Sequence, residues 1–206
     1  MKRIVTLLCI ALALVAFTGC KKHKKEKGPK QDPAPSAPAD VVAVDMGLSV
    51  LWADRNIGAA SPEDLGDSFA WGESKARSIN SFANDYVFND TEPPVRLTPD
   101  YDTATLLWGD GWRMPTQAEI KELFALTKEE IKEGDTIIGM RVSATNGNSI
   151  YFSDDPNDSV LSLRLWTSER SDKDEIWAYC VDWPKSGSIS TSRREYAHHI
   201  RPVKSK

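Results

Sequence analysis

Residues 153–159 carry oxygen-bearing side chains that could bind a hard cation. Asp155, Asn157 and Ser159 stand at alternating positions, and calcium loops use this spacing to present carboxylate, amide and hydroxyl oxygens. The glycine and the distal glutamate of an EF-hand loop are missing from this stretch. A solvated acidic turn is therefore the favoured interpretation, with calcium binding by these three residues as the alternative. No resident cofactor is expected.

The groups most used in catalysis do not form a recognisable set. His198 and His199 are adjacent, so on a strand they face opposite sides and are poorly placed to bind one metal ion together. Cys180 lies among alternating apolar residues, which indicates a buried, unreactive thiol. A pair of carboxylates such as Asp154 and Asp182 could hydrolyse a glycan if a cleft brought them together. The sequence favours a protein that is not an enzyme.

Cys20 is the residue with the clearest chemistry. A basic start at residues 1–3 precedes an apolar run at residues 4–17, which is too short for a membrane span and typical of a secretory signal. Thr18 and Gly19 then place small residues before the thiol. This arrangement resembles the lipobox of bacterial lipoproteins, in which the cysteine is acylated and becomes the mature N-terminus. The sequence predicts a signal peptide over residues 1–19 and a lipid on Cys20.

Residues 20–40 are predicted to be a flexible tether, and residues 41–206 a single domain. The tether is rich in Lys and Pro, and such a segment has no apolar side chains with which to build a core. From residue 31 onward there are 18 Lys and Arg residues against 29 Asp and Glu, a formal charge of −11. This acidic balance argues against nucleic acid as a partner. The expected contact is with a membrane, through the lipid.

The order of elements in residues 41–206 predicts an α+β fold. Thr116 and Glu119 form a capping box before Ile120, Leu123 and Phe124, which predicts a helix with one buried face. Residues 127–130 repeat the box, and Thr98 is placed to cap a helix over residues 100–107. Asn146 and Gly147 predict a hairpin turn. Strands are expected at residues 41–44, 48–52, 136–142, 149–152, 161–167, 176–183 and 195–203.

Several segments together resemble a known family. They are residues 44–53, 56–59, 69–73, 108–116, 165–168 and 200–203, with Trp-Arg-Met-Pro-Thr at residues 112–116 as the most specific. They resemble the Fibrobacter succinogenes major paralogous domain, which is abundant in lipoproteins of the Bacteroidetes. The resemblance implies a compact, C-type-lectin-like α+β domain related to formylglycine-generating enzymes, with two or more short helices and a small antiparallel sheet. It implies no common activity, and one cysteine cannot supply the pair that formylglycine formation needs.

The resemblance also divides the tryptophans and assigns two arginines. Five tryptophans within the shared segments are expected in the core: Trp52, Trp71, Trp108, Trp112 and Trp166. Trp177 and Trp183 lie outside those segments, so these two, with Asp182, are the candidates for binding a ligand. Arg113 and Arg201 are expected to form buried or half-buried bonds to carboxylates such as Asp45 or Glu73.

These observations favour a membrane-anchored, non-catalytic lipoprotein that binds a glycan or a protein in the cell envelope. The alternatives are a structural subunit of the envelope or of a filament and, ranked last, a hydrolase of envelope polymers. The expected location is the outer membrane of a Gram-negative bacterium. The lysines directly after Cys20 stand where surface-exposed lipoproteins of these bacteria usually carry acidic residues, so the periplasmic face is favoured over the cell surface.

Overall fold

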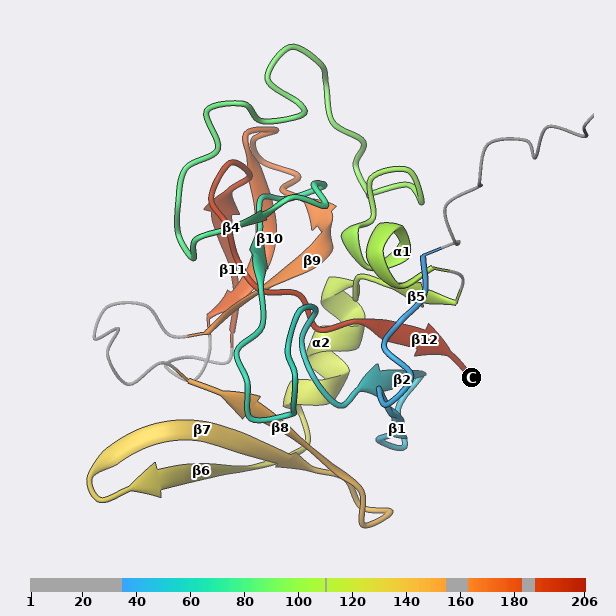
Figure 1. Cartoon of the computed structure of the whole chain (residues 1–206), viewed down its shortest axis with the longest axis vertical. Coiled ribbons are helices and arrows are strands. Elements are labelled where there is room, and N and C mark those ends of the chain that lie inside the picture. Colours follow the sequence, from blue (N-terminus) through green and yellow to red (C-terminus); the bar gives the residue numbers. More distant parts are fainter. Residues whose placement is uncertain (1–34, 110, 155–162, 183–187) are drawn as a thin grey trace, which may run out of the picture. The chain divides into compact units, whose positions relative to one another are not determined.

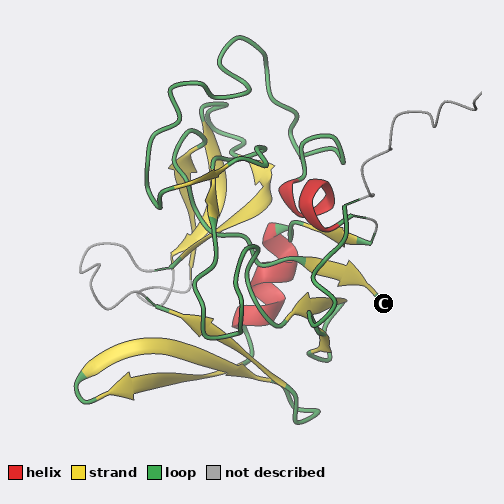
Figure 2. Cartoon of the chain, in the orientation of Figure 1, coloured by secondary structure: helices red, strands yellow, loops and turns green. Residues whose placement is uncertain are grey.

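The computed structural model describes residues 35–109, 111–154, 163–182 and 188–206. Within these ranges the chain forms four small sheets and two short helices (Figures 1 and 2). One sheet has the order β1-β2-β12-β5, made of β1 (Ala43–Asp45), β2 (Val50–Ala53), β12 (Val203–Ser205) and β5 (Trp112–Arg113). The second has the order β11-β10-β9, made of β11 (Ser188–Arg193), β10 (Trp177–Asp182) and β9 (Arg164–Arg170).

The other two sheets are hairpin structures. The third joins β3 (Ser68–Phe69) to β4 (Ala76–Arg77). The fourth has the order β6-β7-β8, made of β6 (Thr127–Glu133), β7 (Thr136–Ser143) and β8 (Ser149–Ser153). All of these strands pair in antiparallel fashion. The turn between β7 and β8 falls at residues 144–148, which confirms the hairpin predicted at Asn146 and Gly147.

The expectation of an α+β, C-type-lectin-like domain with a small antiparallel sheet is wrong. Strand accounts for 38% of the described residues and helix for 9%, with two helices and four sheets, so the fold is β-rich. One reason is the segment after Phe124, where a second capping box suggested another helix. That segment is β6 instead, because β7 pairs with it from Thr127 to Glu133. Pairing with a partner strand here overrides the local helix preference of Lys and Glu.

The segment expected as a strand over residues 195–203 is also mostly irregular. Only Val203 onward belongs to a strand, and Pro202 has no N–H with which to continue the ladder. The residues before it form single bridges: Phe69 with His198, Phe82 with Tyr196, and Leu165 with His199. This segment therefore connects several sheets rather than belonging to one.

Both helices begin at a side chain that caps them. α1 (Thr103–Trp108) starts after Asp102, whose carboxylate accepts the Thr105 N–H, so the cap expected at Thr98 is displaced by four residues. α2 (Gln117–Phe124) has the predicted capping box, in which Thr116 and Glu119 exchange bonds of 3.2 and 2.8 Å. In the described part of the chain, no helix is both long and apolar enough to cross a membrane.

Buried apolar side chains gather in two clusters. One surrounds Trp71 and Trp166 and includes Cys180 of β10. The other surrounds Trp52 and receives the buried face of α2, namely Ile120, Leu123 and Phe124, together with residues of β7, β8 and β9. The five tryptophans expected in the core are at most 8% exposed, which confirms that prediction.

Residues 198–203, here called the closing segment, contact all four sheets. The backbone of His198 exchanges two bonds with Phe69 of β3, and the carbonyl of His199 accepts the N–H of Trp166 in β9 at 3.0 Å. Val203 pairs with β2 and β5, and the Arg201 side chain reaches the backbone of β8. The closing segment therefore joins elements that are distant in sequence.

Arg201 is a charged side chain in the interior, and it is 0% exposed. Its Nε donates to Asn56 Oδ1 at 2.8 Å, and its Nη atoms donate to the carbonyls of Ala53, Asp54 and Tyr151 at 3.3, 3.0 and 2.9 Å. The guanidinium carbon lies 4.2 Å from the Phe152 ring centroid. Burial lowers the Arg201 pKa to about 9. The expected carboxylate partner is absent from these bonds, and carbonyl dipoles take its place.

Replacing Arg201 with methionine is expected to lower the free energy of unfolding by about 2–4 kcal/mol, because buried carbonyl acceptors lose their donors. Arg141→Met is the matched control, since Arg141 is a half-exposed arginine paired with Glu129 and its loss should cost less than about 0.5 kcal/mol. Urea denaturation of both variants measures the difference. Equal stability of the two variants would contradict the role assigned to Arg201.

Residues 35–40, which the sequence placed in the tether, contact the domain. The Ala37 N–H donates to the Trp108 carbonyl at 3.0 Å, and Asp40 pairs with Arg55 at 2.9 Å. Gly109 has a φ of 75°, and a Cβ built there would collide with the Pro35 carbonyl. Only glycine fits both the backbone conformation and the close approach.

Gly109→Ala should therefore release residues 35–40 as well as strain the backbone. Gly147 is the control, because its φ is 89° but nothing lies within 4 Å of its Cβ position. Gly147→Ala should cost about 1 kcal/mol from backbone strain alone, and Gly109→Ala more. Limited proteolysis followed by mass mapping should show faster cleavage near residues 35–40 in Gly109→Ala only. The same cleavage rate in both variants would show that the close contact between Gly109 and Pro35 does not hold residues 35–40 against the domain.

Candidate functional site

The two histidines predicted to have core or surface roles are both buried, at 1% and 2% exposure. His198 Nε2 lies 2.7 Å from Ser192 Oγ, and His199 Nδ1 donates to the Asp67 carbonyl at 3.0 Å. Burial is the main cause that lowers the pKa of His198 to about 3 and of His199 to about 4. Both rings are therefore neutral and closed off from solvent at physiological pH.

Cys180 is buried, as the alternation of β10 predicted, with 0% exposure. Burial is the main cause that raises the pKa of its thiol to about 12, and Asp182 adds to the effect. A thiol with so little thiolate is a poor nucleophile. Cys180 is a residue of the core.

Arg113 forms a half-buried ion pair, but not with the expected carboxylates. Its Nη1 and Nη2 donate to the two carboxylate oxygens of Glu119 at 2.8 and 2.5 Å. Asp45 instead pairs with Lys206 at 2.8 Å, and Glu73 pairs with Arg77 at 2.7 Å. The predicted type of bond is correct and the named partners are wrong. Glu119 was visible in the sequence as a capping residue, but its second role was not.

Trp177 is half-buried and lines a cavity of about 260 Å³, here called the Trp177 cavity. The cavity is also lined by Ser171, Lys173, Asp174, Tyr179 and Thr191. Trp177 and Tyr179 lie two residues apart on β10, so their side chains share one face of the sheet. Thr191 stands opposite Tyr179 on β11. Trp177 therefore lies half-buried at the edge of a cavity, with Tyr179 beside it.

Asp182 does not share the Trp177 cavity. It lies at the other end of β10, and its carboxylate accepts Arg164 Nε at 2.6 Å. Asp154 lies after β8 and lines a different pocket with Glu63, Tyr151 and Ser153. Asp182 does not line that pocket and Asp154 does not line the Trp177 cavity, so neither contains the pair considered for glycan hydrolysis.

Three predictions from the sequence concern residues outside the described ranges: the candidate calcium ligands Asp155, Asn157 and Ser159, the candidate ligand-binding residue Trp183, and the predicted lipidation site Cys20. Where the structure is described, no three His, Cys, Asp or Glu side chains converge to hold a metal ion.

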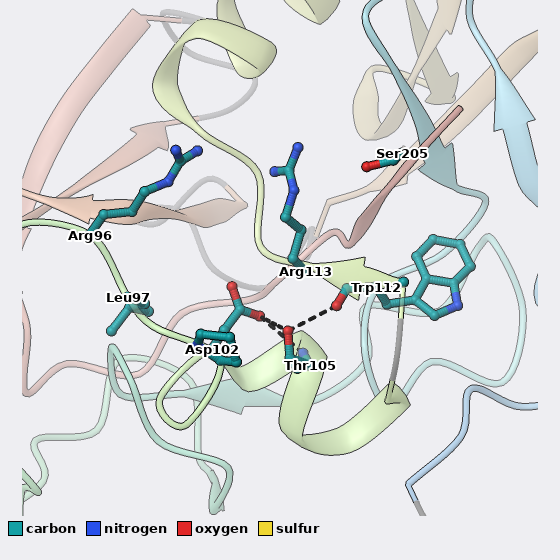
Figure 3. A pocket seen from close by; sticks show the side chains of 9 residues that line it. Arg96, Leu97, Asp102, Thr105, Trp112, Arg113 and Ser205 are labelled. Carbon is teal, nitrogen blue, oxygen red and sulfur yellow. Dashed lines mark hydrogen bonds between the residues drawn. The ribbon is translucent and has the colours of Figure 1, made fainter.

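A larger pocket, of about 540 Å³, lies between α1, β5 and the end of β12 (Figure 3). We call it the arginine pocket, and its lining residues are Arg96, Leu97, Pro99, Asp102, Thr105, Gly111, Trp112, Arg113 and Ser205. Four separate stretches of chain supply them. The sequence marked Trp112 and Arg113 as part of a motif, but it gave no sign that Arg96 and Asp102 would lie beside them.

Asp102 forms the floor of the arginine pocket and is 4% exposed. Its carboxylate accepts the N–H of Thr105 at 3.0 Å and the N–H of Met114 at 3.0 Å. Burial raises the pKa of Asp102, while these backbone donors oppose the rise. The carboxylate joins the start of α1 to the end of β5, which is a structural task that also fixes the shape of the pocket.

The excursion over residues 74–97 is held by Glu73. The Glu73 carboxylate accepts from Arg77 at 2.7 Å and from the Val87 N–H at 3.0 Å. Asp85 pairs with Lys75 and with Arg77, each at 2.9 Å. Hydrogen bonds from Lys75 and then from Arg77 hold the pKa of Asp85 far below its ordinary value. A pocket of about 300 Å³ lies there, and Trp177 is not among its lining residues.

Comparison of the chain with models of known protein families, with curated proteins and with solved structures finds no match. The resemblance of residues 44–203 to the major paralogous domain therefore stays a prediction, and function has to be argued from the described residues.

The histidines predict how stability depends on pH. Their folded pKa values lie below the ordinary value of 6.5, so the unfolded chain binds more protons and the folded state weakens as pH falls through 6.5. Between pH 7.5 and 5.0 the free energy of unfolding should drop by about 1–2 kcal/mol per histidine. Urea titrations across this range measure the drop, and His198→Gln should reduce its slope. A stability that is flat or rises toward pH 5 would contradict the buried neutral state.

Proposed function

We propose that this chain is a membrane-anchored, non-catalytic lipoprotein whose domain binds a glycan or a protein of the cell envelope. The Trp177 cavity carries the proposal, because it places two aromatic rings and several polar side chains on an open surface. The burial of Cys180 and both histidines also supports it, because these nucleophilic and basic groups are closed off from solvent. A hydrolase is disfavoured because Asp182 is already paired with Arg164.

The walls of the Trp177 cavity are stiffened by local hydrogen bonds. Ser171 Oγ accepts the Lys173 N–H at 3.2 Å, and Asp174 Oδ1 accepts the Ile176 N–H at 3.0 Å. The Tyr179 hydroxyl donates to the Asp172 carboxylate. An indole ring beside hydroxyl, carboxylate and ammonium groups suits a sugar, which has apolar C–H faces and polar edges.

Aromatic surface continues past the cavity along the sheet. Arg193 stands opposite Trp177 on β11, and its guanidinium carbon lies 5.3 Å from the centroid of the Phe82 ring. Phe82 is 42% exposed and packs edge-on against Tyr196, which is 36% exposed. Exposed aromatics flanked by arginine are typical of binding surfaces. A ligand longer than one sugar ring, or a protein partner, would extend over these side chains.

Trp177→Ala is expected to weaken binding by about 2 kcal/mol, or roughly thirty-fold, as loss of a central tryptophan does. The purified full chain would be applied to an array of envelope glycans, followed by calorimetry on the best ligand, with a pull-down for protein partners. Tyr101→Ala is the control, because Tyr101 is 36% exposed and lines another pocket. Blank results in both screens, or equal losses in the two variants, would overturn the proposal.

The anchor rests on Cys20 and is tested separately. Labelled palmitate should enter the wild-type chain and not Cys20→Ala, because the thiol is the expected site of acylation. Cys180→Ala is the control, since that thiol is buried. Unchanged labelling of Cys20→Ala would exclude lipidation there. Protease treatment of intact cells should leave the domain uncut if it faces the periplasm, and cleavage would place it on the cell surface.

A structural subunit is the second candidate, and the edge of β6 is the observation that favours it. β6 pairs with β7 on one side, and six of its seven residues are exposed. The β6–β7 hairpin lies at one end of the domain (Figure 1). Lys and Glu dominate β6, however, and charged side chains protect an edge strand from pairing with other chains. We therefore rank this candidate below ligand binding.

A further inference from the structure

We infer that the arginine pocket binds the carboxylate of a small ligand, and that Arg96 supplies the charge that recognises it. This site is separate from the Trp177 cavity, since the two share no lining residue. The inference therefore stands or falls independently of the glycan-binding proposal.

Arg96 is an arginine with unused hydrogen-bonding capacity. It is exposed, and its Nε lies 3.4 Å from Ser168 Oγ. No carboxylate among the described residues forms an ion pair with it. Figure 3 shows its guanidinium on the same side of the pocket as that of Arg113, away from the floor formed by Asp102 and Thr105. Two guanidinium groups at one opening suit a planar anion.

Arg113 is held in place before any ligand arrives. Both of its terminal nitrogens bond to Glu119, and Glu119 is itself fixed by the Thr116 N–H at 2.8 Å. Glu119 balances the charge of Arg113, whereas Arg96 forms no ion pair with a described carboxylate, although Asp102 lies at the floor and Glu169 stands opposite Arg96.

The remaining lining selects the kind of anion. Leu97 and Pro99 provide apolar walls, and about 540 Å³ is within the range of small-molecule pockets. The pocket can therefore hold a ligand body as well as its charged group. The buried carboxyl of Asp102 at the floor would repel a dianion more strongly than a monoanion. This combination favours a carboxylate on a ring-sized or dipeptide-sized ligand over inorganic phosphate.

The test is calorimetry on the purified full chain with matched pairs of probes. One pair is D-glucuronate and D-glucose, the other is N-acetyl-alanyl-alanine and its C-terminal amide, and inorganic phosphate is the fifth probe. At least one carboxylate should bind more tightly than its neutral partner and more tightly than phosphate. A preference within the glucuronate pair would identify the ligand as a sugar acid, and a preference within the dipeptide pair would identify it as a peptide C-terminus.

Arg96→Gln should weaken binding of that carboxylate by at least about ten-fold, and Arg96→Lys by less, because lysine keeps the charge and loses the planar fork. Arg141→Gln removes the same charge from β7 and should change the affinity less than about two-fold. Unchanged melting temperatures would show that all three variants are folded. Three results would overturn the inference: no preference for carboxylates, tighter binding of phosphate, or equal losses in Arg96→Gln and Arg141→Gln.

Discussion

The buried guanidinium of Arg201 is the interaction on which the rest of the structure depends. A full charge in an apolar interior is costly unless donors and acceptors are matched, and here Asn56 and three backbone carbonyls accept its bonds. Those acceptors come from β2, from the loop after it and from β8. Because the closing segment also bridges β3 and β9, a single irregular stretch joins four small sheets, of which the two-stranded β3–β4 sheet would be marginally stable at best on its own.

This arrangement explains where the chemistry of the domain can and cannot occur. His198 and His199 belong to the closing segment and pack in the interior, and Cys180 lies in the first apolar cluster. The polar side chains left at the surface line open cavities at the ends and edges of the sheets, as around Trp177 and Arg96. Exposed aromatic and cationic side chains of this kind support the binding function proposed above.

Local patterns in the sequence predicted local structure well. The capping box at Thr116 and the turn at Asn146 depend on neighbouring residues, and both are present in the structure. The alternation along β10 holds from Trp177 to Cys180 and ends at Val181, which is buried next to Cys180. The β6 strand was missed because its helix-like sequence is overruled by β7, and the fold class was wrong for the same reason. Trp177 could be identified as an outer residue, but the arginine pocket could not, because its lining comes from four stretches that only the tertiary fold brings together.

Native-state hydrogen exchange tests the central role of the closing segment most directly. The amides of Ala53, Ile57 and Trp166 donate to the carbonyls of Pro202, Ile200 and His199. They should exchange slowest, and only through global unfolding, whereas amides of the β6–β7 hairpin should open locally at a lower free energy because β6 is exposed. Exchange of those three amides by local opening, with the hairpin amides protected as well or better, would contradict this account.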